Sequence, residues 1–433
     1  MQAFARNVTL NFSPFEVAAA FHHREHFAFL DSSRNDGEQG RYSVLAWDPK
    51  FVFRTKDEDP FPSLDGLLKS GIAAGAIGYF SYDLFRFLEE YPRLRAVDDL
   101  HLPDCCLAVY DVILTFDHHR NLWGVAAVSR ESAEKRLSEI ERQLRDKPRG
   151  TASKFYAGPA SSNMTREQYV EGVRKALDYI AAGDIYQVNL SQRFTQAFEG
   201  SAFQLFSNLR KVSPSFYGAY LDCGDHVVIS SSPELFLKRT EDDIETRPIK
   251  GTRPRGKTKE EDEALENELI QSEKEAAELT MVVDLERNDL GRVCAFSSVE
   301  VAEHRYVDRL PNLFHTVSTV RGKLRPGTSV VDILRAAFPG GSISGCPKIR
   351  AIQIIDELEP ARRHVYTGAI GFVGPSGNLK LNVAIRTMTI AGGRLHYQAG
   401  SGIVADSDPE KEYDETLHKA AGMQSAADSA YLK

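Results

Sequence analysis

The sequence predicts an α+β fold with layered sheets and helices. Segments typical of strands and of helices are mixed along the chain, without the regular strand–helix–strand alternation of a doubly wound sheet. The chain has 433 residues, of which 42% are hydrophobic. That is enough to build a large core, either as one big domain or as two intertwined ones.

The N-terminal part is expected to consist of short strands joined by loops. Residues 1–125 contain runs typical of strands, such as 41–47 and 106–115. Residues 130–146 have the charge and apolar spacing of an amphipathic helix. Residues 147–164 are rich in Gly, Ala, Ser and Pro, which indicates a connector. We therefore divide the chain into an N-terminal region at 1–146, a connector at 147–164 and a C-terminal region at 165–428.

The C-terminal region opens with a clear helix signal. Thr165 and Gln168 have the spacing of a capping box, and apolar residues then recur at helical spacing as far as Ile180. Residues 185–194 alternate in the manner of a strand. The elements expected after them are a long acidic helical stretch at 258–288, a helix at 347–357, β segments at 367–374, 379–390 and 395–404, and a helix at 409–428.

Composition excludes several classes of partner. The formal net charge of −8 gives no basic surface for nucleic acid. No apolar run reaches the roughly 18 residues that a membrane-spanning helix needs. The first residues lack the apolar core of a signal peptide, and the five cysteines form no CxxC pair. We therefore expect a cytoplasmic protein that binds neither nucleic acid nor membrane.

One basic loop indicates covalent chemistry. Residues 247–256 place Lys250 before a glycine-threonine turn and between arginines, and they follow a segment that contains the acid Glu234. A lysine can act as a nucleophile and a nearby carboxyl group can protonate a leaving group. The combination favours a reaction on a small anionic substrate.

Two pairs of glutamates indicate a metal site. Glu275 and Glu278 share one face of a predicted helix, and Glu412 and Glu415 repeat the spacing on the last helix. Four carboxylates brought together would repel one another unless a cation lay between them, and Mg²⁺ suits an all-oxygen site. Spacing alone favours two solvated acidic faces over a metal site, because the surrounding region is acidic throughout.

Two glycine-rich segments do not fit nucleotide-binding motifs. Residues 400–405 match GxGxxA, but no helix opens directly from them. Residues 340–345 begin like a phosphate-binding loop, but Cys346 and Pro347 stand where Lys and Ser or Thr are needed. The second segment can form an anion-binding nest or a plain tight turn.

Five motifs in order resemble those of the chorismate-utilising enzymes. They are residues 248–256 (PIKGTRPRG), 281–292 (MVVDLERNDLGR), 338–348 (FPGGSISGCPK), 354–359 (IIDELE) and 400–410 (GSGIVADSDPE). A weaker match, FLDSS at 29–33 followed by GRYS at 40–43, extends the resemblance to the N-terminal region. The resemblance implies a large layered β/α sandwich of the anthranilate synthase component I type, with two intertwined subdomains and a chorismate-binding region at 165–428.

Two positions separate the branches of this family. Anthranilate synthases carry alanine where this chain has Lys250, and isochorismate and salicylate synthases carry lysine where it has Gln187. Both positions here resemble the aminodeoxychorismate synthase branch. The alternatives are the anthranilate synthase branch and, in another class, a non-catalytic subunit that binds chorismate or tryptophan.

The resemblance also implies roles for individual residues. Lys250 would be the nucleophile and Glu234 the general acid. Contacts to chorismate would come from Thr252, His315, Tyr366, Arg386, Gly402 and Lys419. Glu278 and Glu415 would bind Mg²⁺ directly, supported by Glu275 and Glu412. Ser32, Pro214 and Phe216 match a tryptophan pocket of relatives, although a plain packed turn explains them equally well.

The resemblance further implies a partner. The reaction needs ammonia, and no cysteine lies in the Gly-x-Cys-x-Gly elbow of a glutamine amidotransferase. We therefore expect a separate glutaminase subunit that docks and delivers ammonia.

Overall fold

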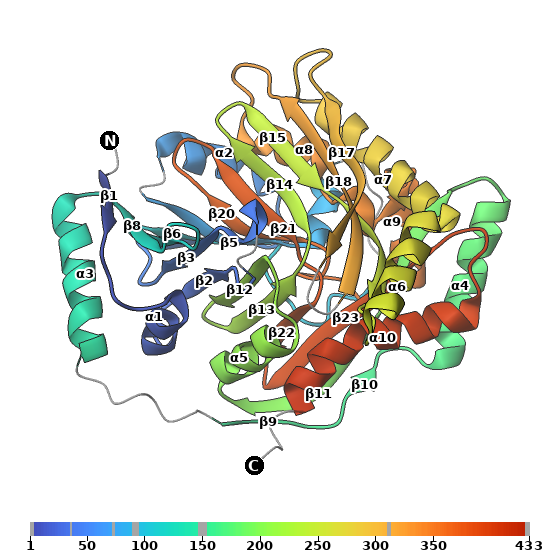
Figure 1. The fold of residues 1–433 in the computed structure, drawn as a ribbon, viewed down its shortest axis with the longest axis horizontal. Coiled ribbons are helices and arrows are strands. Elements are labelled where there is room, and N and C mark those ends of the chain that lie inside the picture. The colour runs from blue at the N-terminus through green and yellow to red at the C-terminus, as the bar shows by residue number, and fades with distance from the viewer. Residues whose placement is uncertain are drawn as a thin grey trace.

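Two antiparallel sheets form the body of the protein (Figure 1). The computed structural model describes residues 4–34, 37–71, 74–88, 95–145, 154–309 and 313–428. Within these residues, the larger sheet has thirteen strands. Its order is β1 (Phe4–Val8), β8 (Leu122–Ala127), β7 (Val112–Asp117), β3 (Tyr42–Ala46), β2 (Ala28–Asp31), β12 (Tyr217–Asp222), β13 (His226–Ser232), β22 (Thr387–Ala391), β23 (Arg394–Ile403), β11 (Gln187–Gly200) and β10 (Ser161–Ser162), with β9 (Phe155–Ala157) and β19 (Gly345–Cys346) also paired to β11.

The second sheet has ten strands in the described part of the chain. Its order is β16 (Ile249–Pro254), β18 (Leu313–Lys323), β15 (Asp243–Arg247), β14 (Leu235–Thr240), β21 (Leu379–Val383), β20 (Ala369–Val373), β5 (Gly75–Phe80), β6 (Cys105–Tyr110) and β4 (Phe51–Thr55), with β17 (Glu300–Arg309) paired to β18. Buried side chains of both sheets, among them Ile77 and Ala219, form one hydrophobic cluster. The two sheets therefore pack against each other, as an α+β sandwich requires.

Helices cover the outside of the two sheets. Figure 1 shows α1 and α3 beside the N-terminal strands, and α4, α6, α7, α9 and α10 toward the opposite end. The helices are α1 (Pro14–Phe21), α2 (Phe61–Ser70), α3 (Arg130–Arg145), α4 (Arg166–Ala181), α5 (Ala202–Val212), α6 (Lys259–Gln271), α7 (Glu273–Gly291), α8 (Val330–Ala337), α9 (Lys348–Leu358) and α10 (Pro409–Asp428), with 3₁₀ turns η1 (Glu38–Gly40), η2 (Tyr82–Phe87) and η3 (Gly341–Ile343). None of the helices in the described residues is long and apolar enough to span a membrane.

The N-terminal and C-terminal regions share both sheets. β2 pairs with β12 in the larger sheet, and β5 pairs with β20 in the smaller one. The predicted intertwined α+β architecture is therefore confirmed. Of the predicted connector, residues 147–153 lie outside the described residues. The rest is not a plain connector, since β9 and β10 both pair with β11.

Several elements differ from the sequence-based expectation. The N-terminal part contains α1, which a capping box between Ser13 and Glu16 starts and whose apolar face is buried. The stretch 258–288 is two helices, because the Ser272 side chain caps the N-terminus of α7. The expected β segment at 379–390 divides into β21 and β22, because Arg386 adopts a positive φ of 49° between them. The Thr165–Gln168 capping box of α4 is confirmed.

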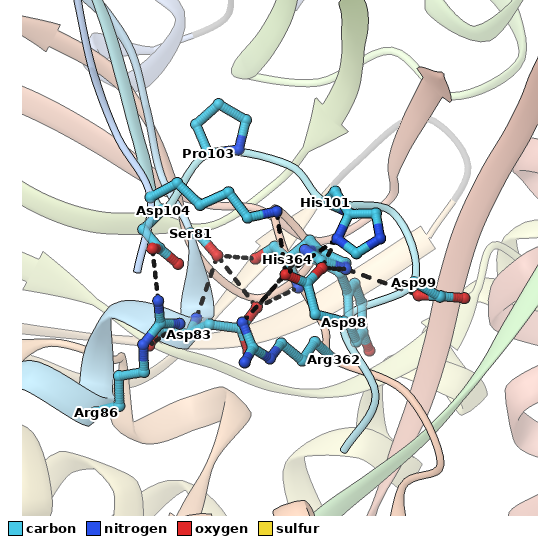
Figure 2. A network of polar contacts seen from close by, with 12 residues as sticks. Ser81, Asp83, Arg86, Asp98, Asp99, His101, Pro103, Asp104, Arg362 and His364 are labelled. Atoms are coloured by element: carbon cyan, nitrogen blue, oxygen red, sulfur yellow. Dashed lines mark hydrogen bonds and ion pairs between the residues drawn. The ribbon is translucent and has the colours of Figure 1, made fainter. Parts of the chain in front are cut away.

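A network of ion pairs and hydrogen bonds holds the segment that leads to Tyr366. Figure 2 shows Arg362 and His364 beside the acids of η2 and of the loop before β6. The His364 amide donates to Asp83 at 3.0 Å, and Arg362 pairs with Asp98 at 3.3 Å. The start of the 362–366 segment is thus tied to elements of the N-terminal region.

Candidate active site

A cavity of about 990 Å³ lies where β16, α7, α10 and the ends of β22 and β23 meet. It brings together residues that are far apart in the sequence. The predicted site residues on its wall are Lys250, Thr252, Glu275, Glu278, Arg386, Gly402, Glu412, Glu415 and Lys419. Charged groups of both signs therefore face one space that is large enough for a small polar substrate.

Lys250 is held inside this cavity as a poorly solvated amine. Its Nζ donates to the Ser342 carbonyl oxygen at 3.2 Å. Burial lowers the pKa of Lys250, and Lys419 adds to the effect, while Glu278 and Glu234 oppose it. Of the two arginines that follow Lys250 in this loop, Arg253 also lines the cavity and is paired there with Glu275, and Arg255 is paired with Asp262.

Glu234 is a buried carboxyl group next to the lysine. Only 4% of the residue is exposed. Burial raises the pKa of Glu234 to about 7, although Ser342, Lys250 and the Ile249 amide pull it down. A large share of Glu234 is therefore protonated at neutral pH, as a general acid must be.

Thr252 and His315 meet across neighbouring strands. They are paired in register between β16 and β18, and Thr252 Oγ1 and His315 Nδ1 are hydrogen-bonded at 2.9 Å. Burial, followed by the charge of Arg386, lowers the pKa of His315 to about 3. The imidazole is therefore neutral, and its buried Nε2 has no hydrogen-bond partner among the described residues.

Gly251 sets the geometry between Lys250 and Thr252. The pairing of β16 with β18 shifts register at this point, and Gly251 has φ +80°. A Cβ here would lie 2.8 Å from Thr316 Oγ1 and 3.1 Å from Glu275 Cδ. Gly251 therefore allows the residues on either side of it, Lys250 and Thr252, to lie close to the glutamates.

We expect Gly251→Ala to lower kcat/KM by about 10²-fold. The added Cβ would displace Lys250, and a small displacement of a reacting group carries a loss of that order. The left-handed backbone adds about 1–2 kcal/mol of strain. Gly327→Ala is a matched control, since Gly327 has φ +83° with nothing within 4 Å of the added Cβ. Steady-state kinetics and urea unfolding of both variants measure the two effects. Equal kcat/KM values for both would contradict this role.

The four glutamates do not form two solvated faces. Glu412 is 5% exposed and accepts a hydrogen bond of 2.6 Å from Ser407, whereas Glu415 remains about half exposed. Glu275 pairs with Arg253 at 2.7 Å, and Glu415 pairs with Lys419 at 2.6 Å. Burial raises the pKa of Glu278, the charges of Lys250 and Lys274 oppose the rise, and those of Glu415 and Glu412 add to it. Negative charge is thus concentrated around one point of the cavity.

Mg²⁺ fits this donor set by its chemistry. All four side chains offer the oxygen ligands that Mg²⁺ prefers. Glu275 Oε2 is buried without a hydrogen-bond partner among the described residues. Side chains in the described ranges nevertheless form no cluster of three or more His, Cys, Asp or Glu that could already hold a metal ion. The metal role of the four glutamates therefore stays a prediction.

Arg386 is poised to bind an anion. Its positive φ places it at the break between β21 and β22, where its guanidinium lines the cavity. Within the described part of the chain, no hydrogen bond or ion pair holds this guanidinium. Burial lowers the pKa of Arg386, and Glu234 partly offsets the effect. A substrate carboxylate would supply the bidentate partner that a guanidinium prefers.

Of the other predicted substrate contacts, some lie on the cavity wall and others do not. Gly402 lies on its wall, and a Cβ there would be 2.7 Å from Gln187 Nε2 and 3.6 Å from Lys250 Nζ. Lys419 donates to the Gly400 carbonyl at 3.1 Å. Tyr366 is 8% exposed and, like Glu234 and His315, is absent from the residues on the cavity wall.

The predicted tryptophan pocket is divided between two cavities. Ser32 and Phe216 line a separate space of about 270 Å³, whereas Pro214 lies on the wall of the larger cavity. Ser32 Oγ donates to the Phe216 carbonyl at 2.9 Å, as a packed turn requires. Tryptophan binding by this set therefore stays a prediction.

Sequence reasoning missed two contributions to the site. Ser342 provides the carbonyl that accepts from Lys250, although the glycine-rich motif that contains it was expected to form only a turn or a nest. Arg34 and Lys274 add two basic residues to the cavity wall. Only the glycine run gave a sequence signal, because Arg34 and Lys274 lie outside the quoted motifs.

The sequence profile of a family described as chorismate binding enzyme matches residues 25–425. The chain belongs to this family. Its fold agrees with solved members. Anthranilate synthase component I from Streptococcus pneumoniae superimposes with a TM-score of 0.79 and 34% identity over 90% of this chain and 93% of that one. The menaquinone-specific isochorismate synthase from Escherichia coli, at 18% identity, supports the fold with a TM-score of 0.78 over 98% and 94% of the two chains.

Two relatives of nearly equal identity to this chain carry different activities. Aminodeoxychorismate synthase component 1 of Bacillus subtilis is 41% identical over 93% of this chain and 92% of its own. Anthranilate synthase component 1 of Thermus thermophilus is 42% identical over the same shares. The chain is therefore a chorismate-utilising enzyme, and similarity alone does not select between the two reactions.

Proposed function

We propose that this chain is component I of an aminodeoxychorismate synthase, which converts chorismate and ammonia into 4-amino-4-deoxychorismate. The observation that supports this choice is the placement of Lys250. Its Nζ lies in the cavity, with a pKa lowered by burial and with the protonatable Glu234 nearby. An amine and an acid at one place suit covalent substitution of a hydroxyl group, whereas a branch with alanine at this position has no such nucleophile.

The proposed reaction has two substitutions. The neutral Lys250 amine attacks C2 of chorismate, the ring double bonds shift, and the C4–O bond breaks. Glu234 donates its proton to the departing 4-hydroxyl, which leaves as water. Ammonia then attacks C4, the double bonds shift back, and the C2–N bond to Lys250 breaks. The net change is one chorismate and one ammonia giving one aminodeoxychorismate and one water.

Other groups of the cavity would bind and orient the substrate. Arg386 would hold a carboxylate, and Lys419 and Gly402 lie on the wall nearby. The neutral His315 and its partner Thr252 can offer uncharged hydrogen-bonding groups to the ring. Glu278 and Glu415, supported by Glu275 and Glu412, would hold Mg²⁺, which when bound supplies positive charge against the glutamates and the substrate carboxylate.

Ammonia would come from a separate glutamine amidotransferase subunit. Of the cysteines, Cys105, Cys106, Cys223 and Cys294 are buried, and the partly exposed Cys346 lies in β19, outside any Gly-x-Cys-x-Gly sequence. Free ammonium salt should replace the partner in an assay, since the proposed chemistry uses ammonia itself.

One assay tests the proposal against its alternatives. The purified chain is incubated with chorismate, Mg²⁺ and an ammonium salt, and the products are identified by mass. We expect accumulation of aminodeoxychorismate. Anthranilate would assign the chain to the other branch, and unchanged chorismate would indicate a subunit that only binds.

The pH dependence tests Glu234. The reaction needs Glu234 protonated, and its pKa is raised to about 7 by burial. As pH rises through this value, the acid form of Glu234 is lost. For each further pH unit, kcat/KM should therefore fall a further tenfold below the value expected if Glu234 stayed protonated. Glu234→Gln cannot titrate, and its profile should cross pH 7 without this break, at a rate about 10²–10⁴-fold lower. The same break in the variant would contradict the acid role.

A further inference from the structure

Cys106 lies at a point where the two sheets meet, outside the catalytic cavity. In β6 it is paired directly with Arg54 of β4 on one side and with Tyr79 of β5 on the other. Directly paired residues project from the same face of a sheet, so these three side chains form a row. The row faces the other sheet, as the contacts of its two outer members show.

The neighbours of Cys106 contact the turn between β12 and β13 and the first residue of β13. Arg54 donates to the Cys223 carbonyl at 3.4 Å and binds the Asp225 carboxylate at 2.7 Å. The Tyr79 hydroxyl is hydrogen-bonded to His226 Nε2 at 2.9 Å. Cys106, between them, therefore faces the turn that contains Cys223.

Cys106 and Cys223 are buried together. They are 3% and 4% exposed and belong to one hydrophobic cluster. Cys105, the next residue of β6, points to the opposite face of the sheet and belongs to another cluster. The topology thus selects one of two adjacent cysteines to meet Cys223.

The electrostatic surroundings make the two thiols unequal. Proximity of the Cys223 thiol lowers the pKa of Cys106, and Arg54 adds to the effect against the opposing burial. The same contact, followed by burial, raises the pKa of Cys223. A thiolate is the nucleophilic form of cysteine, and an adjacent thiol can resolve its oxidised product.

We propose that Cys106 and Cys223 are a peroxide-oxidisable thiol pair that closes into a disulfide between the two sheets. The Cys106 thiolate attacks hydrogen peroxide, an S–O bond forms and the O–O bond breaks, which gives a sulfenic acid and hydroxide. The Cys223 sulfur then attacks the Cys106 sulfur, the S–O bond breaks, and the departing hydroxide takes the Cys223 proton as water. Two thiols and one peroxide give one disulfide and two waters.

The turn offers a route for a small oxidant. Cys223 is followed by Gly224 and Asp225, which are exposed, and Gly224 has φ +87°. The bond would join β6 of the ten-stranded sheet to the β12–β13 turn of the thirteen-stranded sheet. Oxidation of the pair would therefore lock the packing of the two sheets without touching the catalytic cavity.

Peptide mapping of the full chain tests the proposal. The protein is treated with a small excess of hydrogen peroxide, free thiols are alkylated, and the chain is digested without reductant. We expect a linked peptide containing Cys106 and Cys223, two hydrogen masses lighter than the separate peptides and split by reductant. Oxidation of the partly exposed Cys346, with Cys106 and Cys223 still alkylated once the chain is unfolded, would overturn the proposal.

Two serine variants test the order of events. In Cys223→Ser, Cys106 should stop at a sulfenic acid that dimedone labels. In Cys105→Ser, the matched control, the linked peptide should form as in the wild type. Absence of dimedone from Cys106 in Cys223→Ser, or loss of the link in the Cys105 variant, would contradict the assignment. The wild-type mapping is independent of how these variants fold.

Discussion

Lys250→Ala is expected to lower the rate of aminodeoxychorismate formation by about 10³-fold or more, since loss of a nucleophile removes the covalent route as a whole. KM for chorismate should change much less, because Arg386 and the other anion-binding groups remain. Steady-state kinetics with ammonium salt and mass detection of product measure both constants.

Lys257→Ala is the control for this change. Lys257 is an exposed lysine close to the same loop, and its replacement removes equal charge outside the cavity. Its kcat should stay within about twofold of the wild type, as for most surface substitutions. Undiminished aminodeoxychorismate synthesis by Lys250→Ala would refute the covalent role.

The second large effect is expected on stability. Arg363 is 3% exposed and donates to Glu359, to the Ile343 carbonyl at 3.1 Å and to the Asn189 carbonyl at 2.6 Å. It thereby joins the residue that follows α9 to β11 and η3, next to the Ser342 carbonyl that receives Lys250. Arg363→Met leaves the Glu359 charge buried without its partner, which should lower the free energy of unfolding by about 3–5 kcal/mol. Urea unfolding followed by circular dichroism measures the change.

A pair at the surface provides the comparison. Arg350 pairs with Asp184 at 2.8 Å, and both side chains are more than a third exposed. Arg350→Met should therefore cost at most about 1 kcal/mol, as exposed pairs do. A similar loss of unfolding free energy in both variants would contradict the added cost expected from burial of the Arg363–Glu359 pair. Partial recovery in Arg363→Met/Glu359→Leu is also expected, because that variant removes both buried charges.

Local signals were sufficient for much of the fold. The capping box at Thr165 and the apolar spacing after it placed α4, and the last helix, expected at 409–428, is α10. The division of 258–288 at Ser272 was missed, because residues that favour helix lie on both sides of this cap. α1 was also missed, although Ser13 and Glu16 carry its capping signal, because the N-terminal part was read as strands only.

Long-range features of the site were out of reach. The sequence could place Lys250 and the glutamates in one cavity only through the resemblance to a family. Nothing local to Ser342 shows that its carbonyl receives Lys250, because that contact depends on the packing of η3 against β16. The environment of Glu234 is likewise tertiary, since its raised pKa follows from burial beneath several strands.

The central claim is that Lys250 bonds to the substrate during turnover. The direct measurement is to quench the wild-type enzyme during turnover of chorismate, first without ammonia and then with it, and to weigh the digested peptides. We expect the peptide containing Lys250 to be heavier by one chorismate less one water without ammonia, and this adduct to decline when ammonia is added. Product formation with no adduct on that peptide under either condition would contradict the account.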